Sequence, residues 1–380
     1  MKTKITQCQL TLSVDVQSKI EELKSSLIYA MSKGSHELFH TNIWAWLIER
    51  DKRFCNVFFP GMKGVFKCVK REDGNRDLTI WVELNGSRKA YVVENKFKSF
   101  PRAEQLENYT KDLGNEFAEG LLVALRIPEN IRLVKWNVCT QTELMGRLQE
   151  VLQDNTIPIS MSDRRVISQY IRMTNCLSEI LASGADALSA RWPLLVTANL
   201  FEDVKLGDIF QKIKASEFVE FIESQPEIGD WRNQIGAFSS KDRRLSLDVE
   251  SGFSRKQCLL DFRIVMRKPL KDKWSEWAGI GVQIQGGAYN RCVYSYNKAK
   301  GADWLDKRFG ESWLEDKEFL LPDVSLNSKI CSFTTDKYNF RYRGIAIPSD
   351  SFKLLFDRLR KEMSQMLDML RNGFLDELFS

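Results

Sequence analysis

Three strand-like segments follow one another between residues 64 and 97, and they constrain the fold more than any other feature. Their sequences are GVFKCVK (64–70), RDLTIWVEL (76–84) and KAYVVENKF (89–97). Each is rich in the β-branched and aromatic residues that favour strands. The turns between them hold Gly74-Asn75 and Asn85-Gly86, residue types that tolerate the positive φ of tight turns. The pattern predicts three consecutive strands joined by hairpin-type turns.

Segments with helical spacing lie on both sides of these strands. Apolar residues recur at helical spacing over 16–31 and again over 36–50, before the first strand. After the third strand we expect, in order, a helix from Pro101 to about Leu113, an apolar strand at 118–127, a strand at 136–140 and a further helix. The order helix, three strands, helix, strand predicts an α/β fold with a mixed central sheet flanked by helices.

The length of 380 residues suggests about two domains. We predict a first domain over 1–160, a helical linker over 161–194 and a C-terminal α+β domain over 195–380. Strand-like segments at 243–251, 257–267 and 279–285 indicate an antiparallel sheet in the last of these, and an amphipathic helix at 351–370 closes the chain.

Composition excludes several classes of protein. Apolar residues make up 43% and charged residues 28%, which is ordinary for a globular chain and unlike a disordered or fibrous one. No run of about 18 apolar residues is present, and the N-terminus lacks the apolar core of a secretion signal. The eight cysteines form no CxxC pair, which is typical of reduced thiols. We therefore expect a cytoplasmic protein with no membrane partner.

The segment His36-Glu-Leu-Phe-His40 matches HExxH, the signature of zinc peptidases. In that interpretation both histidines bind zinc and Glu37 is the general base. The chain has only these two histidines, so the third ligand would have to be a downstream glutamate that no motif marks. A zinc peptidase therefore stays open as an alternative.

A second group of residues comes from the strands. Asp77 opens one strand, and Glu94-Asn95-Lys96 ends the next. Because side chains alternate along a strand, Glu94 and Lys96 face the same side, and Asp77 can join them from the adjacent strand. Two carboxylates brought together repel, and a hard divalent cation such as Mg²⁺ or Mn²⁺ removes that penalty. With a lysine to orient water, the group suits metal-dependent hydrolysis of phosphodiesters.

This pattern, Asp, sixteen residues, then Glu-x-Lys, resembles the PD-(D/E)XK nuclease superfamily. The segment from Glu37 to Ile48 is similar to the E-x-x-H opening helix of one bacterial branch of that superfamily, in which the corresponding strand ends in I-E-N-K, as Val93-Glu94-Asn95-Lys96 does here. Gln105 and Tyr109 are similar to the Q-x-x-x-Y motif of RecB-like nucleases. The resemblance covers residues 35–126.

The resemblance implies a restriction-endonuclease-like core and a role for each matching residue. Asp77 and Glu94 would be metal ligands, Lys96 the base that orients water, and Glu37 an additional acid that reaches the Mg²⁺ or Mn²⁺ directly or through water. Gln105 would support the site, and Tyr109 and His40 would contact the substrate. The implied partner is nucleic acid, DNA rather than RNA, and the implied context is bacterial defence against phage.

Each of these residues also has an ordinary structural explanation. An acid such as Glu37 is favoured in a first helical turn by the helix dipole. His40 can hydrogen-bond within a buried junction, and Gln105 and Tyr109 can form a simple i, i+4 contact. Asp77 after a turn is ordinary turn chemistry, and Lys96 can pair with Glu94 alone.

Two stretches carry excess positive charge. Residues 50–76 hold eight Lys and Arg against three acids, and residues 241–273 hold ten against five. Such stretches can contact phosphates or be solvated faces, and the aromatic residues near the second stretch, Tyr294 among them, can stack on bases or pack in a core. We expect the C-terminal domain to govern substrate or partner choice, a defence-system protein included, or dimerisation. A non-catalytic nucleic-acid-binding module and a sensor protein remain alternatives.

Overall fold

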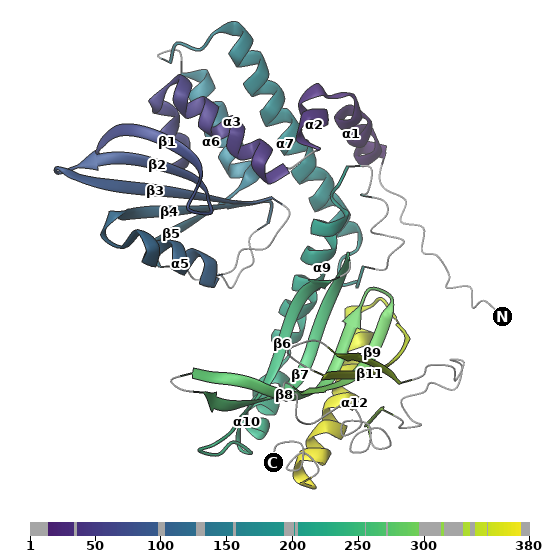
Figure 1. Ribbon diagram of the computed structural model, residues 1–380. Coiled ribbons are helices and arrows are strands. Elements are labelled where there is room, and N and C mark those ends of the chain that lie inside the picture. Colours follow the sequence, from purple (N-terminus) through teal and green to yellow (C-terminus); the bar gives the residue numbers. More distant parts are fainter. Residues whose placement is uncertain are drawn as a thin grey trace. The chain divides into compact units, whose positions relative to one another are not determined.

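The computed structural model describes residues 14–33, 36–97, 103–126, 134–154, 157–193, 201, 204–254, 256–270, 273–295, 313–314, 330–334, 339–347 and 349–373 (Figure 1). The chain divides into two compact units. Unit 1 comprises Met1–Ala187 and Asn199–Phe210, and unit 2 comprises Leu188–Ala198 and Gln211–Ser380. Each unit has its own sheet and its own hydrophobic core.

The sheet of unit 1 has five strands in sequential order. They are β1 (Val65–Asp73), β2 (Arg76–Leu84), β3 (Ser87–Lys96), β4 (Phe117–Ala124) and β5 (Trp136–Thr140). The first three are antiparallel neighbours, whereas β4 pairs with β3 in parallel and β5 pairs with β4 in parallel. The predicted mixed sheet is confirmed, and its tight turns place Asn75 and Asn85 at positive φ.

Helices cover both faces of this sheet (Figure 1). On one face, α5 (Ala103–Leu113) buries Leu106 and Tyr109 against Val92 and Trp136. On the other face, α3 (His36–Arg50) contacts β1, β2 and β3, and α6 (Gln141–Gln153) contacts β4 and β5. Helix α6 begins where it does because Thr140 and Glu143 form a reciprocal capping box.

The remaining helices of unit 1 differ in part from the sequence prediction. The single helix expected over 16–31 is two helices, α1 (Val14–Ser25) and α2 (Leu27–Ser32). Ser26 separates them because its backbone is extended and its hydroxyl accepts a hydrogen bond from the N–H of Tyr29. Helix α7 (Met161–Ala187), expected to be a linker, lies within unit 1 and contacts α1, α2 and α6.

The short helices of unit 1 sit at the ends of longer elements. They are η1 (Lys52–Phe54), α4 (Cys55–Phe58) and η2 (Gly114–Glu116). The seven cysteines among the described residues are free thiols. Among the helices of the described part, none combines the length and the apolar character needed to cross a lipid bilayer.

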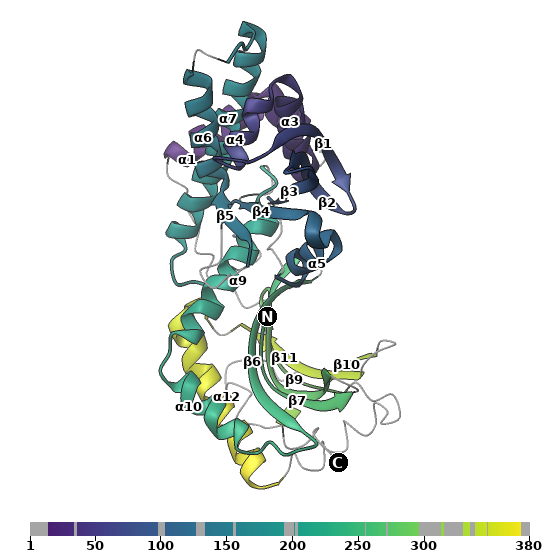
Figure 2. The ribbon, with the colours of Figure 1, turned by 90° about the vertical axis from the view of Figure 1, so that its left-hand side faces the viewer.

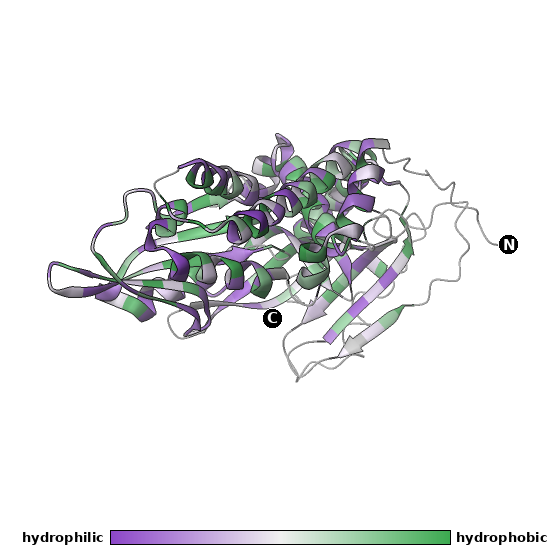
Figure 3. Ribbon diagram, turned by 90° about the horizontal axis from the view of Figure 1, so that it is seen from above, coloured by the Kyte–Doolittle hydropathy of each residue, from purple (hydrophilic) through white to green (hydrophobic). Residues whose placement is uncertain are grey.

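The sheet of unit 2 has six antiparallel strands in the order β10-β11-β9-β8-β7-β6. The strands are β6 (Arg244–Ser254), β7 (Gln257–Leu270), β8 (Lys273–Gln285), β9 (Ala288–Ser295), β10 (Cys331–Thr334) and β11 (Asn339–Ala346). Hydrophobic and hydrophilic residues alternate along its strands (Figure 3), so one face is apolar.

Three helices pack on the apolar face of this second sheet. They are α9 (Gly207–Glu223), α10 (Glu227–Gly236) and α12 (Phe352–Arg371), and Figure 2 shows α10 and α12 on the same side of the strands. Phe218, Ile235 and Leu359 from these helices join Phe262 and Ile280 of the sheet in one buried cluster. The expected antiparallel sheet and closing helix are confirmed.

Replacing Gly120 by alanine tests the packing within the first sheet. An added Cβ would overlap the indole of Trp136, which pairs with Gly120 across β4 and β5. The ring cannot retreat freely, because it is buried and its Nε1 donates to Thr110 Oγ1 at 3.0 Å. We expect Gly120→Ala to lower the free energy of unfolding by about 1–3 kcal/mol, measured by urea denaturation.

Gly146 provides the matched control. It lies in helix α6, where an added Cβ meets no atom within 4 Å. Gly146→Ala should leave stability unchanged or raise it by up to about 1 kcal/mol. Equal effects of the two substitutions would contradict the assigned packing.

Candidate active site

Two carboxylates lie at neighbouring strand ends in unit 1. Leu78 of β2 pairs with Val93 of β3, so Asp77 and Glu94 are the next residues on the two strands. The backbone N–H of Asn95 donates to Asp77 Oδ2 at 2.7 Å, which fixes the first carboxylate against β3. The hairpin register therefore places the two acidic side chains together, as the sequence predicts.

The carboxylate of Glu94 is enclosed, with only 2% of its side chain exposed. Lys96 Nζ lies 2.7 Å from Glu94 Oε1, and Gln105 Nε2 donates to the same oxygen at 2.9 Å. The other oxygen, Oε2, is buried and makes no hydrogen bond within the described residues. A buried carboxylate oxygen without a partner is costly, so this atom favours a cation as its neighbour.

Burial and mutual repulsion change the pKa values of the groups at this site. Burial and then the charge of Asp77 raise the pKa of Glu94 to about 7, although Lys96 opposes the shift. Burial also raises the pKa of Asp77, against the opposing hydrogen bond from Asn95 and the charge of Lys96. Burial lowers the pKa of Lys96, but attraction to Glu94 and Asp77 outweighs it and the net pKa is raised. Lys96 is therefore an ammonium ion at neutral pH.

Helix α5 supports Glu94 through a short chain of hydrogen bonds. Gln105 Nε2, besides binding Glu94, donates to Tyr109 Oη at 2.6 Å. Tyr109 in turn donates to the backbone carbonyl of Asn75, in the β1–β2 turn, at 2.6 Å. The i, i+4 spacing predicts the contact between Gln105 and Tyr109 on one helix face. Through these two side chains the β1–β2 turn is linked to Glu94.

A second network on the opposite face was not predicted. Asn95 Nδ2 donates to the backbone carbonyl of Glu37 at 3.1 Å, and Gln141 Nε2 donates to Asn95 Oδ1 at 2.9 Å. Both amide side chains are fully buried. They tie the end of β3 to the starts of α3 and α6. The sequence feature that could have indicated a role for Gln141 is its position directly after the capping residue Thr140, at the start of α6.

Glu37 and His40 both lie on α3, but they differ in burial and in their neighbours. Glu37 is half-buried in the first turn of α3, and its charge acts on both Asp77 and Lys96. His40 has no exposed surface, its Nδ1 lies 2.6 Å from Tyr170 Oη, and its ring stacks on Phe97 with centroids 4.4 Å apart. A side chain enclosed in this way cannot contact a substrate, so the substrate-binding role expected for His40 does not fit.

The same enclosure bears on the zinc interpretation of HELFH. A zinc ligand must direct a ring nitrogen at the ion and hold its other nitrogen on a polar partner. His40 Nδ1 has such a partner in Tyr170 Oη, but its ring is fully buried among the aromatic rings of Phe39, Trp44, Phe97 and Tyr170. Across the part of the chain that the structure describes, no group of three or more His, Cys, Asp or Glu side chains could hold a metal ion. The side chain of His36 lies outside the description. The packing of His40 gives the zinc site no support.

The donor set at Asp77 and Glu94 fits a hard divalent cation. Within the described residues no group of three or more His, Cys, Asp or Glu side chains is arranged to hold an ion, so Glu37 is not a third ligand in this structure. Mg²⁺ is commonly held by one or two carboxylates, with waters and substrate phosphates completing the shell. The two strand-end carboxylates meet that requirement.

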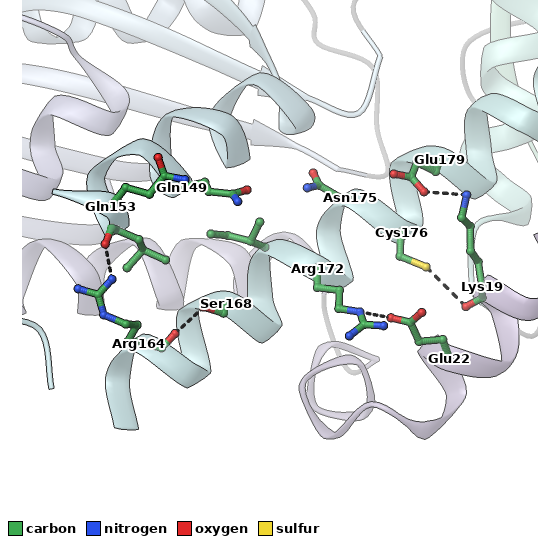
Figure 4. Close-up of a pocket in the computed structure, with 12 residues that line it drawn as sticks. Lys19, Glu22, Gln149, Gln153, Arg164, Ser168, Arg172, Asn175, Cys176 and Glu179 are labelled. Carbon is green, nitrogen blue, oxygen red and sulfur yellow. Dashed lines mark hydrogen bonds and ion pairs between the residues drawn. The ribbon is translucent and has the colours of Figure 1, made fainter. Parts of the chain in front are cut away.

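A separate cavity of unit 1 lies away from the acidic pair. It has a volume of about 670 Å³ and lies among α1, α6 and α7 (Figure 4). Four of its charged groups form ion pairs: Lys19 lies 2.9 Å from Glu179, and Arg172 pairs with Glu22. A smaller hollow of about 440 Å³ is lined by Asn75, Gln105 and Tyr109, and Gln105 also binds Glu94. The acidic pair is therefore a better candidate site than this cavity.

The chain matches no protein-family model, no curated protein and no solved structure.

A charge-removing substitution tests the repulsion at the acidic pair. Glu94 has a raised pKa, so its folded form keeps a proton that the unfolded chain has lost between about pH 4.5 and pH 7. The folded state is therefore favoured at low pH, and that advantage is lost as pH rises to about 7. Without divalent ions, Glu94→Gln should be more stable than the wild type at pH 8, by up to about 3 kcal/mol, in urea denaturation.

The control is Glu83→Gln at the other end of β2. Glu83 is half-exposed and pairs with Lys67, which lowers the pKa of its carboxyl. Its replacement should give no gain in stability at pH 8. A loss of stability in Glu94→Gln would show that the pair is not repulsive.

Proposed function

We propose that this chain is a metal-dependent nuclease that hydrolyses phosphodiester bonds. The observation that supports the proposal is the convergence of one buried carboxylate, one half-buried carboxylate and one ammonium at neighbouring strand ends, with Lys96 Nζ 2.7 Å from Glu94. The proposed substrate is nucleic acid, DNA rather than RNA. A restriction-endonuclease-like core is part of this proposal, and the order α3, β1–β3, α5, β4 is compatible with it.

Asp77 and Glu94 would hold Mg²⁺ or Mn²⁺. When bound, such an ion acidifies water and neutralises charge on the phosphate. Lys96, kept protonated by the two carboxylates, is placed to orient water and to stabilise negative charge on the substrate. Gln105 is a positioning residue, because it holds Glu94 Oε1 while leaving Oε2 open to a ligand.

The resemblance of the sequence motifs also suggests a biological role. Nucleases of the branch that it resembles often occur in bacterial systems against phage, and we include a defence role as part of the proposal. Unit 2 would then govern the choice of substrate or partner, or dimerisation. Glu37, whose charge reaches Asp77 and Lys96, would act on the ion through water.

One observation favours a second candidate, a non-catalytic nucleic-acid-binding module. Lys96 already neutralises part of the acidic pair, and both Lys96 and Gln105 occupy the same oxygen of Glu94. If this lysine makes an ion unnecessary, nucleic acid would bind through other surfaces of the chain and would not be cut. The two candidates differ in whether divalent ions bind and whether the substrate is cut.

Cleavage assays separate these candidates. We expect the full chain to cut at least one of plasmid, linear double-stranded DNA, single-stranded DNA and RNA with Mg²⁺ or Mn²⁺, and none with EDTA. Lys96→Ala should slow cleavage about 100- to 10,000-fold, as expected for loss of a group acting on the attacking water. The measurement is the initial rate of strand scission on gels.

Lys89→Ala is the control for this assay. Lys89 lies on the same strand and contacts the backbone carbonyl of Asn115, away from the acidic pair. It should cleave like the wild type. Cleavage that persists in EDTA and in Lys96→Ala would overturn the proposed mechanism.

Ion binding can be measured without activity. Because the pKa of Glu94 is about 7, an ion must displace a proton at pH 6 but not at pH 8. We expect Mn²⁺ to raise the melting temperature at pH 8, with an apparent affinity about 10-fold weaker at pH 6. The shift should vanish in Asp77→Asn. An equal shift in Asp77→Asn would place the ion elsewhere.

A further inference from the structure

Two buried amide side chains meet at the end of β3, on the face of the first sheet that packs against α3 and α6. Asn95 and Gln141 have no exposed surface. Gln141 is the first residue of α6, directly after β5. Because β3, β4 and β5 are parallel and Lys96, Ala124 and Thr140 pair in one row, the ends of these strands lie side by side. Gln141 therefore reaches Asn95 across the end of β4, which lies between the two.

The backbone carbonyl of Glu37 fixes the direction of the hydrogen bonds in this network. A carbonyl oxygen can only accept, so Asn95 must turn its Nδ2 toward Glu37, at 3.1 Å. Asn95 Oδ1 then faces Gln141, which must donate with its Nε2, at 2.9 Å. The remaining oxygen, Gln141 Oε1, is buried and has no hydrogen-bond partner within the described residues. The amide pair is therefore only partly satisfied.

A partly satisfied pair of buried amides costs stability. An unpaired buried polar group is unfavourable, whereas two apolar side chains of similar shape would leave no group unpaired. Packing alone therefore does not explain why the fold has amides at positions 95 and 141. Such departures from the most stable arrangement are common at functional sites.

The network holds two parts of the candidate active site at once. On one side of β3, the backbone N–H of Asn95 donates to Asp77 Oδ2 at 2.7 Å. On the other side, the Asn95 side chain ties the first turn of α3, where Glu37 lies, to the strand end. The charge of Glu37 acts on Asp77 and Lys96, so its effect depends on where this turn is held. Gln141 keeps the Asn95 amide in the orientation that makes this contact.

We propose that Gln141 is a positioning residue that acts, through Asn95, on Glu37 and hence on the bound ion. The inference rests on the proposed function, in which Glu37 reaches Mg²⁺ or Mn²⁺ through water. Without the donor from Gln141, the Asn95 amide is free to rotate and to release the carbonyl of Glu37. The first turn of α3 would then lose its fixed distance from the acidic pair.

The test replaces Gln141 by methionine, which has a similar shape and no amide. Gln141→Met removes the unpaired Oε1 but leaves Asn95 Oδ1 unpaired, so we expect little change in melting temperature. We expect Mn²⁺ to bind about 10-fold more weakly at pH 8, as is typical when a residue that orients a metal site is lost. The affinity is measured from the Mn²⁺-dependent rise in melting temperature, and kcat for cleavage should fall while KM stays unchanged.

A double-mutant cycle separates positioning from a general loss of packing. If Gln141 acts through Glu37, then Glu37→Gln should weaken Mn²⁺ binding in the wild type but cause little further loss in Gln141→Met. Effects that add would overturn the inference.

A second variant removes both amides. Asn95→Leu combined with Gln141→Leu leaves no amide unpaired, so it should be at least as stable as the wild type and yet show the same loss of Mn²⁺ affinity. A purely structural role predicts the reverse, with Mn²⁺ affinity following stability.

Gln211 provides the matched control, because it is a buried glutamine of unit 2. Its Oε1 accepts a hydrogen bond of 3.0 Å from the N–H of Cys258. Gln211→Met should lower the melting temperature but leave the Mn²⁺ affinity unchanged. Wild-type Mn²⁺ affinity and kcat in Gln141→Met would overturn only this inference, whereas a wild type that neither binds Mn²⁺ nor cuts would overturn the proposed function as well.

Discussion

The repulsion between Asp77 and Glu94 is the constraint on which the organisation of unit 1 depends. Two carboxylates at adjacent strand ends, one almost fully enclosed, are unfavourable unless something positive lies between or beside them. Lys96 supplies one charge, and hydrogen bonds from Asn95 and Gln105 supply partial charges. This arrangement neutralises the pair only partly, which leaves one buried oxygen suited to a cation. The fold is therefore less stable at the place where the proposed chemistry would need an open ligand.

The alternation of β3 divides the support of this site between two faces. Glu94 and Lys96 face α5, where Gln105 holds the carboxylate and Tyr109 anchors the β1–β2 turn. Asn95 faces the other way and binds the carbonyl of Glu37 and the amide of Gln141. Helices on both sides of the sheet thus converge on one strand end. Preorganisation of this kind would hold the proposed catalytic groups in place during the proposed reaction.

Local patterns in the sequence predict most elements and the acidic pair itself. Repeats of 2 and 3.6 residues can be read from a short stretch of sequence. They predict the strands near 64–97, the helix 36–50 and the shared face of Glu94 and Lys96. The contact from Gln141 to Asn95, the burial of His40 and the inclusion of α7 in unit 1 depend on pairs distant in the chain. No local period encodes such pairs, so a histidine in a zinc-like motif becomes a packed core residue.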